Sequence, residues 1–377
     1  MPAAVTSMPK LFPLFGLKSE GYPGMGQPRR NQISLKATPY YHLVSRCVRR
    51  EFLCGHDLLT GKDYSHRRQW ICQRLERLVQ IFAVDVCAYA VMSNHYHLVV
   101  RIDEQTARSW TPHEVLRRWL MLFKGPAWMH EVVQSGHRMA SHPSMSLVVA
   151  MYRSRLMSLS WFMRCINEPI ARRANREDGV NGHFWQGRYR CQALLDEGAL
   201  MTAMTYVDLN PLRAGIVERP EDAEYASVAQ RFAHAAGSPF PGTGPKLMAL
   251  PAGGAEESDG SGASPPLTLL EYLELIDWSA RAVAAGKGAA MPDGIPPVLS
   301  RLGLSSEMFG DFVAAGGGHG LAVLGDPDSL RSWAVSLGRH YFRGRRLAAA
   351  LFRRAGERLR FSSSKHVDRS QRLLPST

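Results

Sequence analysis

Four short segments of the chain have the composition and alternation of β-strands. Tyr40–Cys47 is rich in residues that favour strands, and Val84–Met92 is almost wholly apolar. After the two-residue connection Ser93–Asn94, His95–Ile102 alternates strictly, so these two segments predict a β-hairpin. Gly187–Leu194 is the fourth strand candidate.

Apolar residues recur at threes and fours in several longer segments, which predicts helices. One helix is expected to begin at Thr111, because Thr-Pro-His-Glu offers an N-cap, a proline in the first turn and a glutamate three residues on. The last helix of the central region is expected to begin after Asp196 and end by Asn210, because Pro211 disfavours helical geometry just before it. The remaining expected helices are 65–83, 147–176 with a bend near Pro169, 268–284 and a stretch from Leu330.

The strand 95–102 would have two chemically different faces, because residues two apart in a strand share a face. Tyr96, Leu98, Val100 and Ile102 form an apolar face for the core, which leaves His95 and His97 side by side on the other face. Two neutral imidazoles at this spacing can hold one divalent metal ion. The alternative is two unrelated histidines of the surface or the core.

The expected helix after Asp196 carries a candidate nucleophile. Tyr206 and Asn210 are four residues apart and so lie on one face, whereas Leu200, Met204 and Val207 form the apolar stripe. Tyr206 lies about 120° from the centre of that stripe, so it is expected off the main buried face with its hydroxyl available to a site. The alternative is an ordinary half-buried tyrosine with Asn210 as a helix-end residue.

Composition excludes several classes of protein. The 377 residues, 45% hydrophobic, suffice for two or three domains with a sizeable core. No apolar run approaches the ~20 residues of a membrane span, and the first residues lack the pattern of a signal peptide. Six scattered cysteines without a CxxC pair fit a reducing cytosol, so we expect a cytoplasmic protein.

The net charge of +13 predicts attraction to polyanions, and it is unevenly distributed. Residues 235–330 are acidic, with net charge −7, between two basic regions of +10 each. Composition divides the chain into a disordered extension (1–30), a main domain (31–235), a Pro/Gly-rich linker (236–267) and a helical accessory domain with a basic tail (268–377). The basic tail is either a phosphate-contacting segment or a solvated helix face.

Four stretches in order resemble the REP-associated tyrosine transposases of the HUH (His–hydrophobic–His) superfamily. They are PRRNQISL (28–35) with YYHLVSRC (40–47), AVMSNHYHLVV (90–100), GHFWQGRYRCQALLDE (182–197) and YVDLNPLRAGIV (206–217). The resemblance covers 28–231. The stretch 103–146 departs from the family pattern, and we expect it either to enlarge the helical cover over the site or to insert a loop there. With the strand and helix pattern, the fold expected is α+β: a ferredoxin-like core with an antiparallel sheet flanked by helices, and a mainly helical C-terminal part.

The resemblance implies the role of each candidate residue. Tyr206 would be the nucleophile, His95 and His97 would bind Mg²⁺ or Mn²⁺, and Asn210 would be the third protein ligand. A metal on the scissile phosphate would make a phenol, whose pKa is ordinarily ~10, an adequate nucleophile. Two histidines and an amide would also suit Zn²⁺, Ni²⁺ or Co²⁺. The implied partner is single-stranded or hairpin DNA, and the candidate contacts are Arg29, Arg30, Asn31, Trp185, Arg188, Tyr189 and Arg190.

The expected function is therefore a metal-dependent single-strand DNA endonuclease and strand transferase that works without a nucleotide cofactor, through a 5′-phosphotyrosine. Two alternatives stay open: a non-catalytic hairpin-DNA-binding protein, and an HUH replication initiator or relaxase. The latter usually carry paired tyrosines and a carboxylate or third histidine, whereas this helix offers one tyrosine and Asn210. The protein is expected to act as a monomer or a homodimer. Trp185 and Tyr189 have core packing as their alternative role.

Overall fold

The computed structural model describes residues 33–48, 53–57, 61–135, 145–251, 265–285, 294, 296–315, 321–338 and 345–352. The candidate DNA contacts Arg29, Arg30 and Asn31, the basic tail beyond 352 and the whole expected N-terminal extension (1–30) lie outside these residues. No helix in the described ranges combines the length and the apolar character needed to cross a bilayer.

The sheet has the order β2-β3-β1-β4-β5. Its strands are β1 (Tyr40–Arg46), β2 (Val84–Val91), β3 (His95–Ile102), β4 (Arg190–Leu194) and β5 (Val323–Leu324). The first four pair antiparallel to their neighbours, in the order of a ferredoxin-like β-α-β-β-α-β unit, so the predicted α+β class is confirmed. The sheet is not antiparallel throughout, because β5 joins β4 in parallel from more than 120 residues away.

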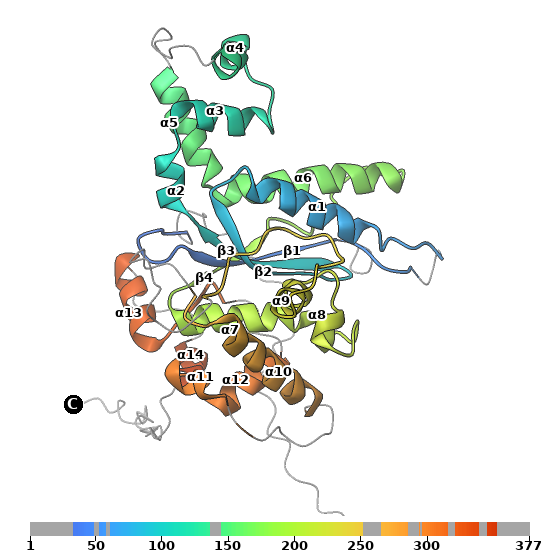
Figure 1. Cartoon of the computed structure of the whole chain (residues 1–377), viewed down its shortest axis with the longest axis vertical. Helices are drawn as coiled ribbons and strands as arrows, with labels where there is room; N and C mark the ends of the chain where they lie inside the picture. Colours follow the sequence, from blue (N-terminus) through green and yellow to red (C-terminus); the bar gives the residue numbers. More distant parts are fainter. Residues whose placement is uncertain are drawn as a thin grey trace, which may run out of the picture.

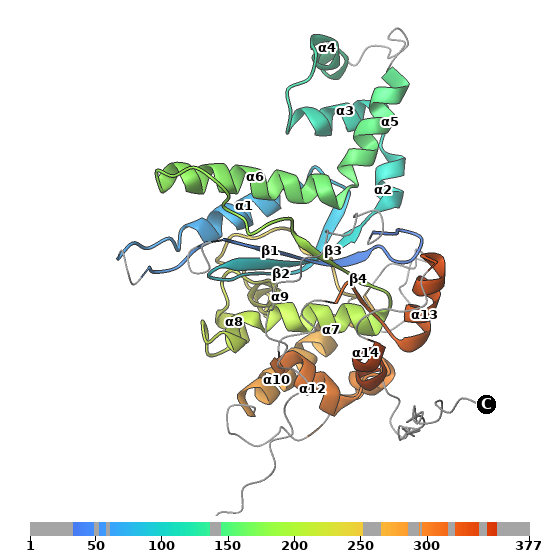
Figure 2. The ribbon, with the colours of Figure 1, turned by 180° about the vertical axis from the view of Figure 1, so that it is seen from behind.

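Helices cover both faces of the sheet (Figures 1 and 2). On one face, α1 (Arg67–Val79) and α6 (Leu159–Glu177) pack in one core cluster with Tyr96, Leu98 and Val100. On the other face, α7 (Glu197–Asp208) packs in a second cluster with Val99 of the same strand. Alternate residues of β3 therefore pack in two different cores, one on each face of the sheet. The helix that carries Tyr206 lies on the face of His95 and His97, as the sequence predicted.

The predicted helix starts are correct where a side-chain cap defines them. Thr111 accepts a hydrogen bond from the Glu114 amide at 3.2 Å and begins α3 (Pro112–Leu120). Asp196 accepts from the Ala199 amide at 2.8 Å and begins α7. In both cases the cap oxygen satisfies an amide that has no partner within the helix.

The prediction of one helix over 147–176 that bends near Pro169 is wrong. Two helices are present, α5 (Met145–Leu156) and α6, and Ser158 between them has extended backbone geometry. Pro169 lies inside α6, where it cannot donate to the carbonyl of Cys165 four residues earlier. That carbonyl accepts from Arg74 Nε of α1 at 2.7 Å, so a neighbouring helix supplies the missing donor.

Four helices form an arm that projects from the sheet on the side of α6 (Figures 1 and 2). They are α2 (Glu104–Ser109), α3, α4 (Ala127–Ser135) and α5. Most of the arm comes from the stretch 103–146, which was expected to cover the site or to insert a loop there. The arm lies instead on the face of the sheet opposite His95 and His97. That expectation is therefore wrong, because α5 continues towards α6 and not towards α7.

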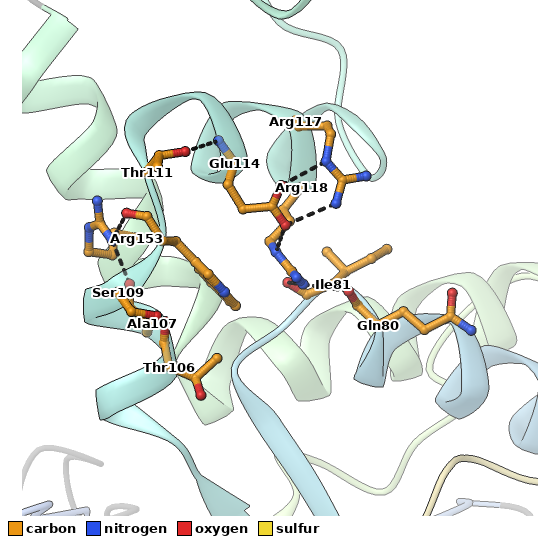
Figure 3. A network of polar contacts seen from close by, with 11 residues as sticks. Gln80, Ile81, Thr106, Ala107, Ser109, Thr111, Glu114, Arg117, Arg118 and Arg153 are labelled. Carbon is orange, nitrogen blue, oxygen red and sulfur yellow. Dashed lines mark hydrogen bonds and ion pairs between the residues drawn. The ribbon is translucent and has the colours of Figure 1, made fainter.

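Arginines join the arm to the core and to itself (Figure 3). Arg118 donates to the carbonyls of Gln80 and Ile81 at the end of α1, and its Nε lies 2.6 Å from Glu114. Arg153 donates to the carbonyls of Ala107, in the last turn of α2, and of Trp110, its C-cap. Carbonyls at helix ends lack partners within the helix, so these two arginines are structural donors and part of the basic charge is engaged within the fold.

The C-terminal part is mainly helical, as expected, and shares a core with the sheet domain. After α7 come α8 (Asn210–Arg213), a 3₁₀ turn (Pro220–Asp222), α9 (Ser227–Ala235), α10 (Leu269–Ala285), α11 (Pro297–Arg301), α12 (Ser306–Ala315), α13 (Pro327–Ser336) and α14 (Arg345–Leu351). Helices α10 and α12 pack on α7 within the second core cluster. Within the expected linker, Leu247 pairs with Val86 of β2, so that part of the segment packs on the sheet domain.

Candidate active site

Three adjacent strands place polar side chains on one face of the sheet, beneath α7. In the register, Arg46 of β1 lies opposite His95, Val44 lies between His97 and Arg190, and His42 lies opposite Gln192 of β4. Because alternate residues share a face, His42 and Arg46 project to the same side as the two histidines of β3. The sheet thus collects a polar cluster that no single strand contains.

Tyr206 packs on this cluster from above. Its ring lies edge-on to the rings of His97 and His42, with centroids 5.6 and 6.0 Å apart. The prediction that Tyr206 lies off the buried face is wrong, because only 2% of the residue is exposed. The sheet covers one side of α7 and the C-terminal helices cover the other, so the helix has no solvent face.

The two histidines of β3 stand close together, and each has its Nδ1 engaged. Their ring centroids are 4.8 Å apart. His97 Nδ1 lies 2.9 Å from His42 Nε2, and His95 Nδ1 lies 2.5 Å from Asn94 Oδ1. Histidines that bind metals typically use one ring nitrogen while the other is held by a hydrogen bond. The pair therefore fits a divalent cation bound through Nε2.

Asn210 and Arg213, from α8, close the site beside Tyr206. Asn210 donates through Nδ2 to the Tyr206 carbonyl at 3.0 Å and accepts through Oδ1 from Arg213 Nη1 at 3.2 Å. The Arg213 guanidinium carbon lies 5.0 Å from the centre of the Tyr206 ring. A cation on the Asn210 oxygen would share it with this guanidinium, so the fit of Asn210 as a ligand is poorer than that of the histidines. In the described part of the chain, no cluster of three or more His, Cys, Asp or Glu residues is placed to hold a metal.

Burial and charge act in opposite directions on Tyr206. Burial in the site raises the pKa of its phenol above the ordinary value, and the nearby Arg213 and Arg46 guanidiniums oppose that increase in pKa. Arg46 is exposed at the end of β1, and Arg213 is half-buried. The same positive charges that favour a phenolate would attract a phosphate group.

The described DNA-contact candidates fall on different sides of the sheet. Trp185 donates through Nε1 to the Asn167 carbonyl at 2.9 Å and packs edge-on to Tyr96, on the face opposite the histidines. The Tyr189 hydroxyl lies 3.3 Å from Ser160 Oγ, and Tyr189 packs on the same core as Trp185. Arg188 and Arg190 are exposed, and Arg190 aligns with Val44 on the histidine side.

Four residues of the cluster were missed in the sequence: His42, Arg46, Gln192 and Arg213. One signal was present: alternation in YYHLVSR already places His42 and Arg46 on one face of the first strand. Arg213 lies in α8, beyond the expected end of the helix of Tyr206, so the helical period gave no signal for it. The pairing of Gln192 with His42 had no local signal, because the two residues are 150 positions apart.

Comparisons with known proteins give one structural likeness. A search of solved structures finds the structure of a REP-associated tyrosine transposase bound to a REP hairpin, with a TM-score of 0.32 and 13% sequence identity, covering 59% of this chain and 94% of the other. No family model matches the chain, and no curated protein matches it either. A likeness of this degree says nothing about the roles of individual residues.

Proposed function

We propose that this protein is a metal-dependent single-strand DNA endonuclease and strand transferase that uses Tyr206 as its nucleophile. The observation that supports this most is the position of the Tyr206 ring, edge-on to His97, which itself stands beside His95. A phenol, a pair of imidazoles with their Nδ1 atoms engaged and two guanidiniums meet on one face of the sheet. All belong to the same chain, so the tyrosine would act on the site of its own subunit.

The reaction forms one bond and breaks another at phosphorus. The Tyr206 hydroxyl oxygen attacks the scissile phosphate, the bond from phosphorus to the 3′ oxygen breaks, and the phenolic proton is lost while the departing 3′ oxygen gains one. The products are a 5′-phosphotyrosine and a free 3′-hydroxyl. Attack by another 3′-hydroxyl reverses the step and joins strands, and the covalent link conserves the energy of the bond. A Mg²⁺ or Mn²⁺ ion held by His95 and His97 would supply neutralisation of the phosphate charge.

The basic residues around the site would position the DNA. Arg46 and Arg190 are exposed on the histidine side of the sheet, and Arg213 stands against the tyrosine ring. Guanidiniums bind phosphate oxygens with charge-assisted hydrogen bonds. A tyrosine held on a buried helix cannot easily reach a phosphate in line within a stacked duplex, which favours a single strand. The hairpin form of the DNA comes from the sequence resemblance.

A covalent-adduct assay tests the nucleophile. The protein is incubated with end-labelled hairpin DNA and Mn²⁺ or Mg²⁺, and protein–DNA adducts are separated by denaturing electrophoresis. We expect Tyr206→Phe to abolish the adduct and Tyr152→Phe to leave it unchanged, because Tyr152 stacks on Trp119 in the arm, remote from the cluster. An adduct that survives Tyr206→Phe would refute the assignment of the nucleophile.

A second assay separates catalysis from binding. We expect His95→Ala to lose cleavage while it retains much of the hairpin affinity, because the residue would hold the metal and not the DNA backbone. Equal loss of both would indicate a structural role for His95. One observation favours the alternative of a non-catalytic hairpin-binding protein: Tyr206 is only 2% exposed. That alternative predicts hairpin binding with no adduct in any metal.

A further inference from the structure

A chain of hydrogen bonds runs from β4 through β1 to β3 behind the histidine pair. Gln192 Oε1 lies 3.3 Å from His42 Nδ1, and His42 Nε2 lies 2.9 Å from His97 Nδ1. The three side chains are almost fully buried, with residue exposures of 7%, 7% and 1% in that order. His42 is 55 positions from His97 and 150 positions from Gln192 in the sequence, so this series of hydrogen bonds exists only in the folded sheet.

The direction of proton donation along these hydrogen bonds follows from Gln192. An amide oxygen can only accept, so His42 must carry its proton on Nδ1. The Nε2 of a neutral His42 is then an acceptor, and the bond to His97 requires a proton on His97 Nδ1. The neutral His97 is left with a lone pair on Nε2.

We propose that His42 and Gln192 are positioning residues that fix the tautomer and orientation of His97, so that its Nε2 presents a lone pair to a divalent cation. This inference rests on the proposed function, because it concerns the same metal site. Neither residue would touch the metal or the DNA. Each acts through His97, in the way that outer partners orient and polarise the ligands of metal sites.

The tautomer of His95, the second histidine of the pair, is also set by a hydrogen bond to an amide oxygen, without an intervening histidine. His95 Nδ1 meets the side-chain oxygen of Asn94 directly, at 2.5 Å. An amide oxygen therefore accepts the last hydrogen bond in both cases. For His95 this oxygen belongs to the neighbouring Asn94, and for His97 it belongs to Gln192, with His42 in between. Both histidines would keep the proton on Nδ1 and offer Nε2, which is what two ligands of one cation require.

The polarity of the chain distinguishes this role from simple packing. If the Gln192 amide presented its NH₂ group to His42, each bond would reverse and the proton of His97 would move to Nε2. That nitrogen could not then bind a metal. A packing role would tolerate either direction, whereas a positioning role requires the direction in which Gln192 Oε1 accepts from His42.

The experiment uses the full-length protein and measures the tautomer of His97 and the affinity for Mn²⁺ separately. Long-range ¹H–¹⁵N correlation of the histidine-labelled apo protein shows which ring nitrogen of His97 carries the proton, with His97→Gln to assign its signals. Calorimetric titration with Mn²⁺ alone gives the affinity. The variants are Gln192→Met, which removes the acceptor at similar volume, and His42→Phe, which keeps a ring in the stack.

We expect a proton on Nδ1 of His97 in the wild type and an Mn²⁺ affinity about 10- to 100-fold weaker in both variants. His113→Phe is the matched control, because the His113 Nε2 contacts the Val133 carbonyl in the arm at 3.1 Å, and it should change neither reading. A wild-type His97 protonated on Nε2 would overturn the inference even if the variants do not fold. Mn²⁺ binding weakened by His95→Ala but not by Gln192→Met would overturn it too and leave the metal site standing. No Mn²⁺ binding by the wild type would refute the proposed metal site itself.

Discussion

The carboxylate of Asp208, two residues after Tyr206, ties the C-terminal helices to the core through a buried hydrogen bond. The residue is 1% exposed. Its Oδ2 accepts from the Tyr272 hydroxyl of α10 at 2.6 Å, and its Oδ1 accepts from the Ser227 hydroxyl of α9. Two hydrogen bonds therefore join three helices at one carboxylate, and removal of the Tyr272 hydroxyl should weaken the attachment of α10 to α7.

The size of that effect depends on pH, because the charge of Asp208 does. Burial raises the pKa of this carboxyl to about 6, although Arg231, Ser227 and Tyr272 act to lower it. The value lies above the ordinary ~3.9, so ionisation of Asp208 weakens the folded state. The corresponding stability is fully present below about pH 4 and is lost as the pH rises through about 6.

We predict that Tyr272→Phe lowers the free energy of unfolding by about 2 kcal/mol at about pH 7.5, where the lost bond is to a charged group. At about pH 5, where Asp208 is mostly protonated, the loss should fall to about 1 kcal/mol, as for a neutral bond. The difference of about 1 kcal/mol corresponds to a further increase of roughly 0.7 units in the pKa of Asp208. The helix that carries Tyr206 would lose the same stabilisation.

Urea unfolding of the full chain at the two pH values measures both losses. Tyr96→Phe is the matched control, because the Tyr96 hydroxyl donates to the neutral amide of Asn167 at 2.6 Å and its ring is equally buried. Its loss should be about 1 kcal/mol at either pH. If Tyr272→Phe showed the same loss at both pH values, the bond to an ionised Asp208 would be refuted.

Two further predictions concern packing and the site. Gly244→Ala should lower the free energy of unfolding in urea by about 1–3 kcal/mol, because the added Cβ would collide with the buried Tyr89 hydroxyl. Gly187→Ala should change it by less than about 0.5 kcal/mol, because the added Cβ would have no neighbouring atom within 4 Å. Equal effects would contradict the close approach. Arg213→Gln should slow single-turnover adduct formation about 100-fold, because it removes a cation from the ring of Tyr206 and from the phosphate, while Arg213→Lys should retain part of the rate. An unchanged rate in Arg213→Gln would exclude Arg213 from the reaction.

Local patterns predicted the local parts of this structure. The bounds of β3 follow from alternation over 95–102, and the starts of α3 and α7 follow from the caps Thr111 and Asp196. Each of these depends on residues within three or four positions. The side-by-side histidines were predictable for the same reason, because the two-residue period of a strand is a local property.

Contacts between distant segments could not be predicted in this way. β5 has two residues, Val323 and Leu324, too few for any periodicity, and its parallel partners in β4 lie 130 positions earlier in the sequence. The burial of Tyr206 depends on α10 and α12, which begin more than 60 residues later. An apolar stripe assumes that a helix has one solvent face, and α7 has none.

Exposure along the sheet face indicates how DNA would enter a site whose tyrosine is buried. Arg46 is exposed, His95 opposite it is half-buried, and His97 is 1% exposed. His42 and Gln192, further along the same face, are each 7% exposed. A phosphate would therefore arrive at the edge of the face where Arg46 and His95 lie. The Arg46 guanidinium would offset the charge of the phosphate before the phosphate reaches the Tyr206 phenol. His42 and Gln192 are joined to the site by the hydrogen bond between His42 and His97, so we expect them to influence the reaction through His97.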